Sequence, residues 1–259
     1  QKITGPGGEL VRIEVFVHGA LCMAISGKCY LSLHSMDSSA NRGACLQVCR
    51  RSYEVRDKET EAVFEVDHEY IMSPKDLCTI KILDEIIHSG ARVLKIEGRG
   101  RSPEYVKTVT RIYRNAVNAI IEGNFSEEKT EIWIQELGTV YNRGFWEGYY
   151  LGQHLGEWSR IYGSQASKRK RYLGRITNYF SDLSVAGIRL ETGNLHVGEE
   201  YSINGPTTGV VDGVVEEVRL EYSPVEKAEK GQVCSVKVPA AVRRGDKFYL
   251  VEEVSSSAN

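Results

Sequence analysis

The stretch S-P-K-D-L-C-T-I-K-I-L-D-E-I-I-H-S-G-A-R-V-L-K-I-E, residues 73–97, decides the fold class of the first part of this chain. A serine and a proline at its start are typical of a helix cap, so a helix is expected over Asp76–His88, ended by a glycine. Ala91–Glu97 predicts a buried strand, and the apolar periodicity of the next segment predicts a second helix over Glu104–Glu122. Helix, strand and helix in this order indicate a parallel α/β unit.

Further strands are expected on both sides of this unit. Upstream, Val11–Val17 alternates apolar and charged residues, as a half-buried strand does. A closed eight-stranded α/β barrel takes about 250 residues, so this segment is too short for one. We therefore expect the amino-terminal half of the barrel to lie upstream of Gln1 or to come from another chain. Downstream, Tyr172–Phe180, Val185–Leu190 and Thr208–Leu220 predict the short strands of a small β-barrel or sandwich.

These patterns predict three parts. Residues 1–163 are expected to form the carboxyl-terminal part of a (β/α) barrel that carries a cluster of cysteines. Residues 164–175 are expected to be a basic linker, and residues 176–259 a small all-β barrel.

Composition excludes several classes of protein. The 259 residues are 41% hydrophobic and 26% charged with a formal net charge of -2, which is typical of a globular protein and not of a disordered one. Every apolar run is interrupted too early to cross a bilayer, so we expect no membrane partner and a cytoplasmic location. The first residues show neither an initiator methionine nor a signal peptide, and we expect the chain to be part of a longer one.

Five of the six cysteines fall within the first 78 residues and none forms a CxxC pair. Zinc ribbons use closely spaced pairs, so the wide spacing favours a site assembled from separate loops, which suits a four-thiolate iron-sulfur cluster. The alternative is that these cysteines are small buried apolar residues. The candidate ligands are Cys22, Cys29, Cys45 and Cys78. Cys49 is ambiguous: its spacing from Cys45 permits ligation, but a cluster needs only four thiolates.

Charged residues lie at or near the expected strand ends, where catalytic groups of α/β barrels concentrate. Glu14, His18, Glu97 and Arg99 are candidates for acid–base work or for holding an anionic substrate. Structural roles are the alternative: His18 can hydrogen-bond a backbone carbonyl, and Glu97 can pair with a neighbouring arginine.

A run of basic residues precedes the expected β-domain. Residues 160–175 contain six basic side chains and no acidic one. Such a run can hold an RNA backbone, or it can be a solvated linker. The candidates for RNA contact are Lys168, Arg169, Lys170 and Arg171.

Several motifs resemble those of the collagenase-like peptidase family. They are E-V-F-V-H-G-A-L-C-M-A-I-S-G-K-C at 14–29, N-R-G-A-C at 41–45, M-S-P-K-D-L-C at 72–78, K-I-E-G-R at 95–99, S-P-E-Y-V at 102–106 and R-G-F at 143–145. In addition, G-P-T-T-G at 205–209 and V-R-R-G-D-K at 242–247 look like a terminal barrel that resembles the second domain of elongation factor Tu. That branch of the family is linked to 5-hydroxyuridine at the wobble position of tRNA, and with this domain the resemblance covers nearly the whole chain.

The resemblance implies a cofactor, a co-substrate and a partner. The cluster ligands of the family correspond to Cys22, Cys29, Cys45 and Cys78, which would hold a 4Fe-4S cluster. Prephenate would be the hydroxyl donor, and tRNA the partner.

Three functions remain open at the level of sequence. The first is an iron-sulfur enzyme that hydroxylates tRNA. The second is a collagenase-like peptidase, although the chain has no G-x-S-x-G and no H-E-x-x-H, and a cysteine bound to iron cannot also act as a free nucleophile. The third is a non-catalytic module that binds RNA or protein and has a structural metal site.

Overall fold

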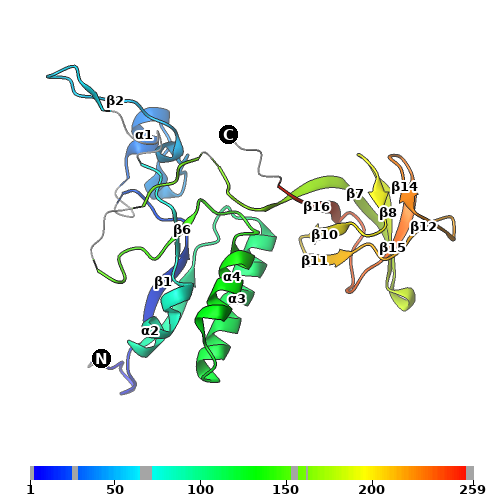
Figure 1. Cartoon of the computed structure of the whole chain (residues 1–259), viewed down its shortest axis with the longest axis horizontal. Coiled ribbons are helices and arrows are strands. Elements are labelled where there is room, and N and C mark those ends of the chain that lie inside the picture. Colours follow the sequence, from blue (N-terminus) through cyan, green and yellow to red (C-terminus); the bar gives the residue numbers. More distant parts are fainter. Residues whose placement is uncertain (1–2, 25–28, 65–71, 153–156, 162, 255–259) are drawn as a thin grey trace. The chain divides into compact units, whose positions relative to one another are not determined.

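The computed structural model describes residues 3–24, 29–64, 72–152, 157–161 and 163–254 and divides the chain into two compact units. The first unit consists of Gln1–Arg101 and Thr108–Gln165, and the second of Ser102–Lys107 and Ala166–Asn259. The first contains a small sheet with helices, and the second consists mainly of strands (Figure 1).

A four-stranded sheet forms the centre of the first unit. Its strands, in spatial order, are β5 (Ala91–Ile96), β1 (Ile13–Gly19), β4 (Asp76–Cys78) and β6 (Phe145–Trp146). β1 is parallel to β5 and β4 is parallel to β6, but β1 and β4 are antiparallel. The parallel pair that the sequence indicates is confirmed. The expected segment of a (β/α) barrel is not, because strands in such a barrel are all parallel and these form an open mixed sheet.

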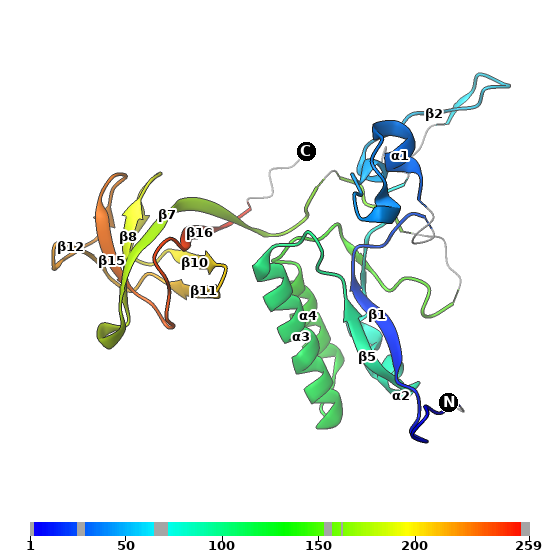
Figure 2. The ribbon, with the colours of Figure 1, turned by 180° about the vertical axis from the view of Figure 1, so that it is seen from behind.

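Three helices follow the strands of this sheet: α2 (Leu83–His88), α3 (Pro103–Ile121) and α4 (Glu127–Leu137). α3 agrees with the periodicity of its sequence, since Val109, Ile112 and Ala116 are fully buried. β1 and β5 lie side by side in both views, with α3 and α4 beside each other (Figure 2). Within the described parts of the chain, no helix is both long enough and apolar enough to pass through a lipid bilayer.

The helix expected over Asp76–His88 begins only at Leu83. Strand β4 and a 3-10 turn at Ile80–Ile82 occupy its first half. The reason is that partners outside the segment hold its backbone. The Asp76 amide donates to the Gly144 carbonyl (2.9 Å), and the Thr79 amide donates to the Val17 carbonyl (3.1 Å). These bonds draw the segment into the sheet.

Asp76 is the buried charge at the centre of this arrangement. It is 1% exposed and forms ion pairs with Arg101 (3.1 Å) and Arg143 (3.3 Å). The ring of Tyr141 lies 4.2 Å from the Arg101 guanidinium and 5.1 Å from that of Arg143. A buried carboxylate requires such partners, because removal from water otherwise costs several kcal/mol.

The described residues of the loop between β1 and β4 form short elements. They are α1 (Leu31–Met36), two 3-10 turns at Ala40–Arg42 and Val48–Arg50, and a hairpin of β2 (Val55–Arg56) and β3 (Val63–Phe64). Residues 20–50 of the sequence are rich in serine and cysteine, which agrees with a segment of loops and short turns.

The second unit is an antiparallel sheet of eight strands. Their spatial order is β11, β10, β16, β7, β8, β15, β12, β13, and they are β7 (Lys168–Phe180), β8 (Val185–Leu190), β10 (Glu200–Gly205), β11 (Gly209–Val214), β12 (Val218–Leu220), β13 (Ser223–Val225), β15 (Val233–Lys237) and β16 (Lys247–Glu253). β9 (Leu195–His196) and β14 (Lys227–Ala228) pair separately. The all-β prediction is confirmed. Among the residues described, β11 and β13 end the sheet without pairing to each other, so no closed barrel is formed. The likeness to elongation factor Tu stays a prediction.

An apolar core holds this sheet together. Tyr201 stacks on Phe248 with ring centroids 5.2 Å apart, and both side chains are buried. The same cluster contains Leu173, Ile188 and Cys234. Burial raises the pKa of the Cys234 thiol to about 11, so this cysteine serves as a small apolar residue of the core.

The expected linker at residues 164–175 is mostly a strand. The two units divide between Gln165 and Ala166, and β7 begins at Lys168. The four basic residues at 168–171 begin β7, which continues with the buried Leu173, Gly174 and Ile176 and pairs with both β8 and β16. The basic residues therefore belong to the second unit.

Loss of the Asp76 charge is expected to destabilise the first unit strongly. Asp76→Asn leaves two buried guanidinium groups without their carboxylate and should lower the free energy of unfolding by about 3–5 kcal/mol. All three tryptophans, Trp133, Trp146 and Trp158, lie in this unit, so urea unfolding followed by tryptophan fluorescence reports on it.

The matched control is Glu14→Gln. This change breaks the exposed pair with Lys95 (3.6 Å) and should cost less than about 1 kcal/mol. Equal effects of the two substitutions would contradict the role assigned to Asp76.

Candidate cysteine site and aromatic cavity

The loop that carries the first four cysteines is held by side-chain hydrogen bonds to its backbone. The Cys29 amide donates to Asn41 Oδ1 (3.1 Å), and the Leu46 amide donates to the buried Ser32 hydroxyl (3.1 Å). Cys29 precedes α1, Cys45 follows the first 3-10 turn, and Cys49 lies within the second. These short turns bring cysteines that are separated in sequence close together in space.

Four cysteines share one neighbourhood. Burial raises the pKa of the Cys49 thiol, Arg50 opposes this, and the thiolates of Cys45, Cys22 and Cys29 raise the pKa further. Among the residues that the structure describes, no three histidine, cysteine or acidic side chains stand close enough to hold a metal ion as placed. The grouping therefore supplies four sulfur donors in one region rather than a finished coordination shell.

Cys78 lies in different surroundings. Its side chain is buried, and burial raises the pKa of its thiol to about 11, an effect that a hydrogen bond with Tyr113 partly offsets. Of the charged groups that act on it, Glu147 raises this pKa and Lys81 lowers it. Cys22, Cys29 and Cys45 thus lie near Cys49, and the ligand set Cys22, Cys29, Cys45 and Cys78 stays a prediction.

His18 is buried beside Cys78, its partner in the pairing of β1 with β4. Its Nδ1 lies 3.4 Å from the Tyr113 hydroxyl, which also donates to the Val17 carbonyl (2.9 Å). Burial, assisted by the positive charge of Arg101, lowers the pKa of His18 to about 3. The imidazole is therefore neutral at pH 7 and stays enclosed in the first unit.

The other charged candidates are placed as follows. Glu14 pairs with Lys95 on the exposed part of the sheet (3.6 Å). The Glu97 carboxylate accepts a hydrogen bond from the Arg99 amide (2.5 Å), and the Arg99 guanidinium donates to the Gly43 carbonyl (3.1 Å). Arg99 thus contacts the loop between the 3-10 turn at Ala40–Arg42 and Cys45.

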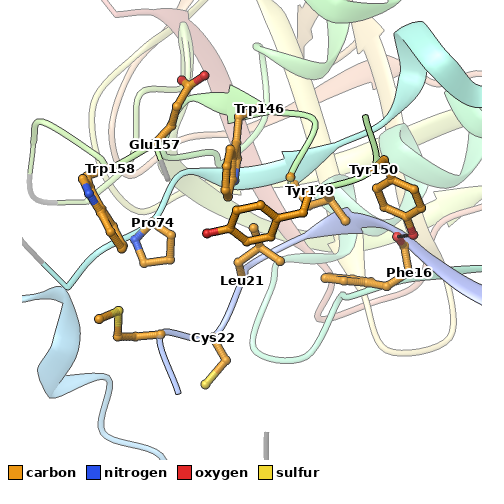
Figure 3. A pocket seen from close by; sticks show the side chains of 12 residues that line it. Phe16, Leu21, Cys22, Pro74, Trp146, Tyr149, Tyr150, Glu157 and Trp158 are labelled. Atoms are coloured by element: carbon orange, nitrogen blue, oxygen red, sulfur yellow. Dashed lines mark hydrogen bonds between the residues drawn. The ribbon is translucent and has the colours of Figure 1, made fainter. Parts of the chain in front are cut away.

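An aromatic cavity of about 480 Å³ adjoins Cys22. Figure 3 shows the rings of Trp146, Tyr149 and Trp158 around it, with Pro74 between them and Cys22 at one edge. Its volume lies within the range of small-ligand sites. The aromatic crowding of residues 145–158 in the sequence is the signal that could have located this cavity.

The polar groups of the cavity are few. Trp146 is 6% exposed, and its buried Nε1 has no hydrogen-bond partner in the described parts of the chain. Glu157 forms an ion pair with Lys75. The described lining residues include no histidine, serine or threonine. The described walls are therefore suited to a flat apolar group, and the described lining residues include no pair of nucleophile and base as in a peptidase.

The four basic residues predicted to contact RNA all lie on β7, and each has an acidic partner. Lys168 pairs with Glu200 (2.7 Å), and Lys170 pairs with Glu104 (2.9 Å). Arg169 (3.2 Å) and Arg171 (2.5 Å) share Glu252. An RNA phosphate would have to replace these carboxylates, so RNA contact at this strand stays a prediction.

The sequence of this chain matches one protein-family model and is similar to several known proteins. The model described as peptidase family U32 matches residues 6–160. A Porphyromonas gingivalis (strain W83) protein named collagenase is 56% identical over 97% of this chain and 61% of its own length. The tRNA hydroxylation protein P1 of Bacillus subtilis is 34% identical over 76% of this chain and 47% of its own length. The 23S rRNA 5-hydroxycytidine C2501 synthase of Escherichia coli is 44% identical over 56% of this chain and 23% of its own length.

The pKa of His18 makes the stability of the first unit depend on pH. In the unfolded chain His18 takes up a proton near pH 6.5, whereas in the folded chain it does so only near pH 3. Its contribution to stability is fully present above pH 6.5 and is lost as the pH falls from 6.5 to about 3, with a slope of about 1.4 kcal/mol per pH unit.

Urea unfolding followed by tryptophan fluorescence between pH 4 and 8 measures this slope. His18→Gln should remove its share of the pH dependence, and His34→Gln, a change at an exposed histidine of α1, should not. An unchanged slope in His18→Gln would show that His18 titrates normally in the folded protein.

Proposed function

This chain belongs to peptidase family U32, and from that membership we propose that it is part of an iron-sulfur enzyme that hydroxylates uridine at the wobble position of tRNA, with prephenate as the hydroxyl donor. The chain spans 61% of the length of the collagenase-named relative. Relatives named for hydroxylation of tRNA and of rRNA support a reaction on RNA.

The observation that carries the proposal is the position of Cys22. This residue belongs to the group of cysteines around Cys49 and also lines the aromatic cavity. A cluster held by these cysteines would therefore adjoin a cavity in which a planar base would stack. Aromatic side chains bind unpaired bases by stacking, and enzymes that modify a base take it out of its stack into such a pocket.

The donor set fits an iron-sulfur cluster. Four thiols are the usual ligands of such a cluster, and Cys22, Cys29, Cys45 and Cys49 share one neighbourhood. We assign Cys49 as the fourth ligand in place of Cys78, whose buried thiol has Tyr113 as its partner. A bound cluster would supply one-electron redox chemistry.

The residues of this chain would position the substrate and exclude water. Trp146, Tyr149 and Trp158 supply faces on which a pyrimidine ring stacks. The buried Trp146 N–H has no described hydrogen-bond partner. Glu157 is held at the cavity by Lys75.

Proteolysis is the second candidate, because the collagenase-named relative is 56% identical. A cysteine peptidase needs a thiolate activated by a nearby imidazole. Among the described residues, Cys78 lies next to His18, and that pair is unsuited to the task. Its thiol has a pKa of about 11 and His18 a pKa of about 3, so both are neutral at pH 7 and both are buried.

Expression of the full-length protein in a bacterial strain without its own tRNA hydroxylation enzymes tests the proposal. Mass spectrometry of tRNA nucleosides should detect 5-hydroxyuridine with the wild type. Tyr149→Leu should lower its yield, since loss of one stacking surface weakens base binding roughly 5- to 100-fold. Tyr149 is 61% exposed, so the variant is expected to fold.

Tyr222→Leu is the matched control, because this tyrosine is 94% exposed and lies in the second unit. It should leave the yield unchanged. Absence of 5-hydroxyuridine together with cleavage of gelatin by the purified protein would favour the peptidase.

A further inference from the structure

A row of three basic side chains, called the basic row below, crosses the sheet of the second unit. Lys247 on β16 lies opposite Arg175 on β7, and Arg175 lies opposite Arg189 on β8. These three strands are neighbours in the sheet (Figure 1). All three side chains are exposed, and the residues before and after each of them are buried. Because directly opposed residues of antiparallel strands point to the same face, the basic row lies on the outer face of the sheet.

The basic row has more positive charge than its described surroundings balance. Like charges directly opposite each other in a sheet are unfavourable. Glu191 pairs with Arg175 (3.5 Å) and also accepts a hydrogen bond from the Tyr172 hydroxyl (2.6 Å). In the described part of the chain, neither Lys247 nor Arg189 has a carboxylate within ion-pair distance. One carboxylate therefore serves three cations.

The basic residues at the start of β7 differ in this respect. Each of the four has a glutamate partner within the second unit. Glu104, which accepts a hydrogen bond from the Asn204 side chain (3.3 Å) opposite Lys247, forms its ion pair with Lys170 (2.9 Å). The charge at residues 168–171 is thus balanced inside the protein, whereas that of the basic row is available to a partner.

A turn at residues 242–246 adds two arginines next to the basic row. The Ile176 amide donates to the Asp246 carbonyl (2.9 Å), which places the turn beside β7. Arg243 and Arg244 are exposed, and neither has a described ion pair. The Asp246 carboxylate is buried and accepts a hydrogen bond from the Arg243 amide (2.8 Å). This bond holds the backbone of the turn.

Two tyrosine rings lie beside the basic row. The Arg175 Nε donates to the Tyr172 hydroxyl (3.3 Å), and the rings of Tyr172 and Tyr249 meet edge to face with centroids 5.6 Å apart. Surfaces that combine cations with aromatic rings are typical of RNA-binding proteins, because the cations contact phosphates and the rings contact bases.

We propose that the basic row binds the phosphate backbone of RNA. A polyanion supplies the negative charge that the basic row lacks, and its regularly spaced phosphates can contact several of the cations at once. The choice of RNA among polyanions rests on the proposed function and on the adjacent tyrosine rings. The surface for RNA is then the basic row instead of residues 168–171.

Fluorescence anisotropy of a labelled, unmodified tRNA transcript, titrated with the full-length protein at several salt concentrations, tests this inference. The double variant Arg189→Gln, Lys247→Gln should bind roughly tenfold more weakly or worse at physiological salt. The slope of log affinity against log salt concentration should become shallower by about 0.7 to 0.9 for each phosphate contact removed. Both residues are exposed and the changes remove like charge from the row, so far-UV circular dichroism should show an unchanged fold.

The double variant Arg169→Gln, Arg171→Gln is the matched control. It removes the same charge from a neighbouring part of the same sheet, but both arginines pair with Glu252. It should change the affinity much less and leave the salt slope as it is in the wild type.

Three results would overturn the inference. They are equal tRNA binding by the wild type and the basic-row variant, a loss in the control as large as in that variant, and binding of phosphatidylserine vesicles through the basic row without binding of tRNA. Measurement of 5-hydroxyuridine is a separate readout. Binding of tRNA through the basic row without formation of 5-hydroxyuridine would support this inference and contradict the proposed function.

Discussion

The ion pairs of Asp76 with Arg101 and Arg143 are the interaction on which the first unit depends. They join three segments that are distant in sequence, and all three side chains are nearly excluded from water. Asp76 lies on β4, which stands between β1 and β6, so the pairs fix the centre of the sheet. Arg143 extends the network to Gln47, between two of the cysteines. The same network of ion pairs and hydrogen bonds therefore holds both the sheet and the cysteine loop.

Two kinds of cysteine follow from this arrangement. Cys78 is packed against the sheet with Tyr113 and His18, where burial keeps the thiol and the imidazole neutral. The cysteines near Cys49 lie in a loop, beside Arg50 and at the edge of an aromatic cavity. Neutral buried groups serve packing, whereas gathered thiols beside a cavity are suited to metal binding and redox chemistry. Membership of a peptidase-named family does not alter this distinction, since function depends on the site rather than on the fold.

Local patterns in the sequence predict the elements that local forces decide. The α3 helix and the β8 strand match their expected ranges closely, because periodicity and turn residues define them. The β4 strand could not be predicted, since its backbone partners lie far away in sequence. Spacing alone also could not choose between Cys49 and Cys78. The sequence shows the charge of the basic residues of β7. It does not show their glutamate partners, because these come from elements that are distant in sequence.

Iron and acid-labile sulfide in anaerobically purified protein test the central claim, that the cluster ligands are the cysteines gathered around Cys49. The measurement compares the wild type with Cys49→Ala and Cys78→Ala. The account predicts about four irons and four sulfides per chain in the wild type, their loss in Cys49→Ala and their retention in Cys78→Ala. Retention in Cys49→Ala with loss in Cys78→Ala, or absence of iron and sulfide from the wild type, would contradict it.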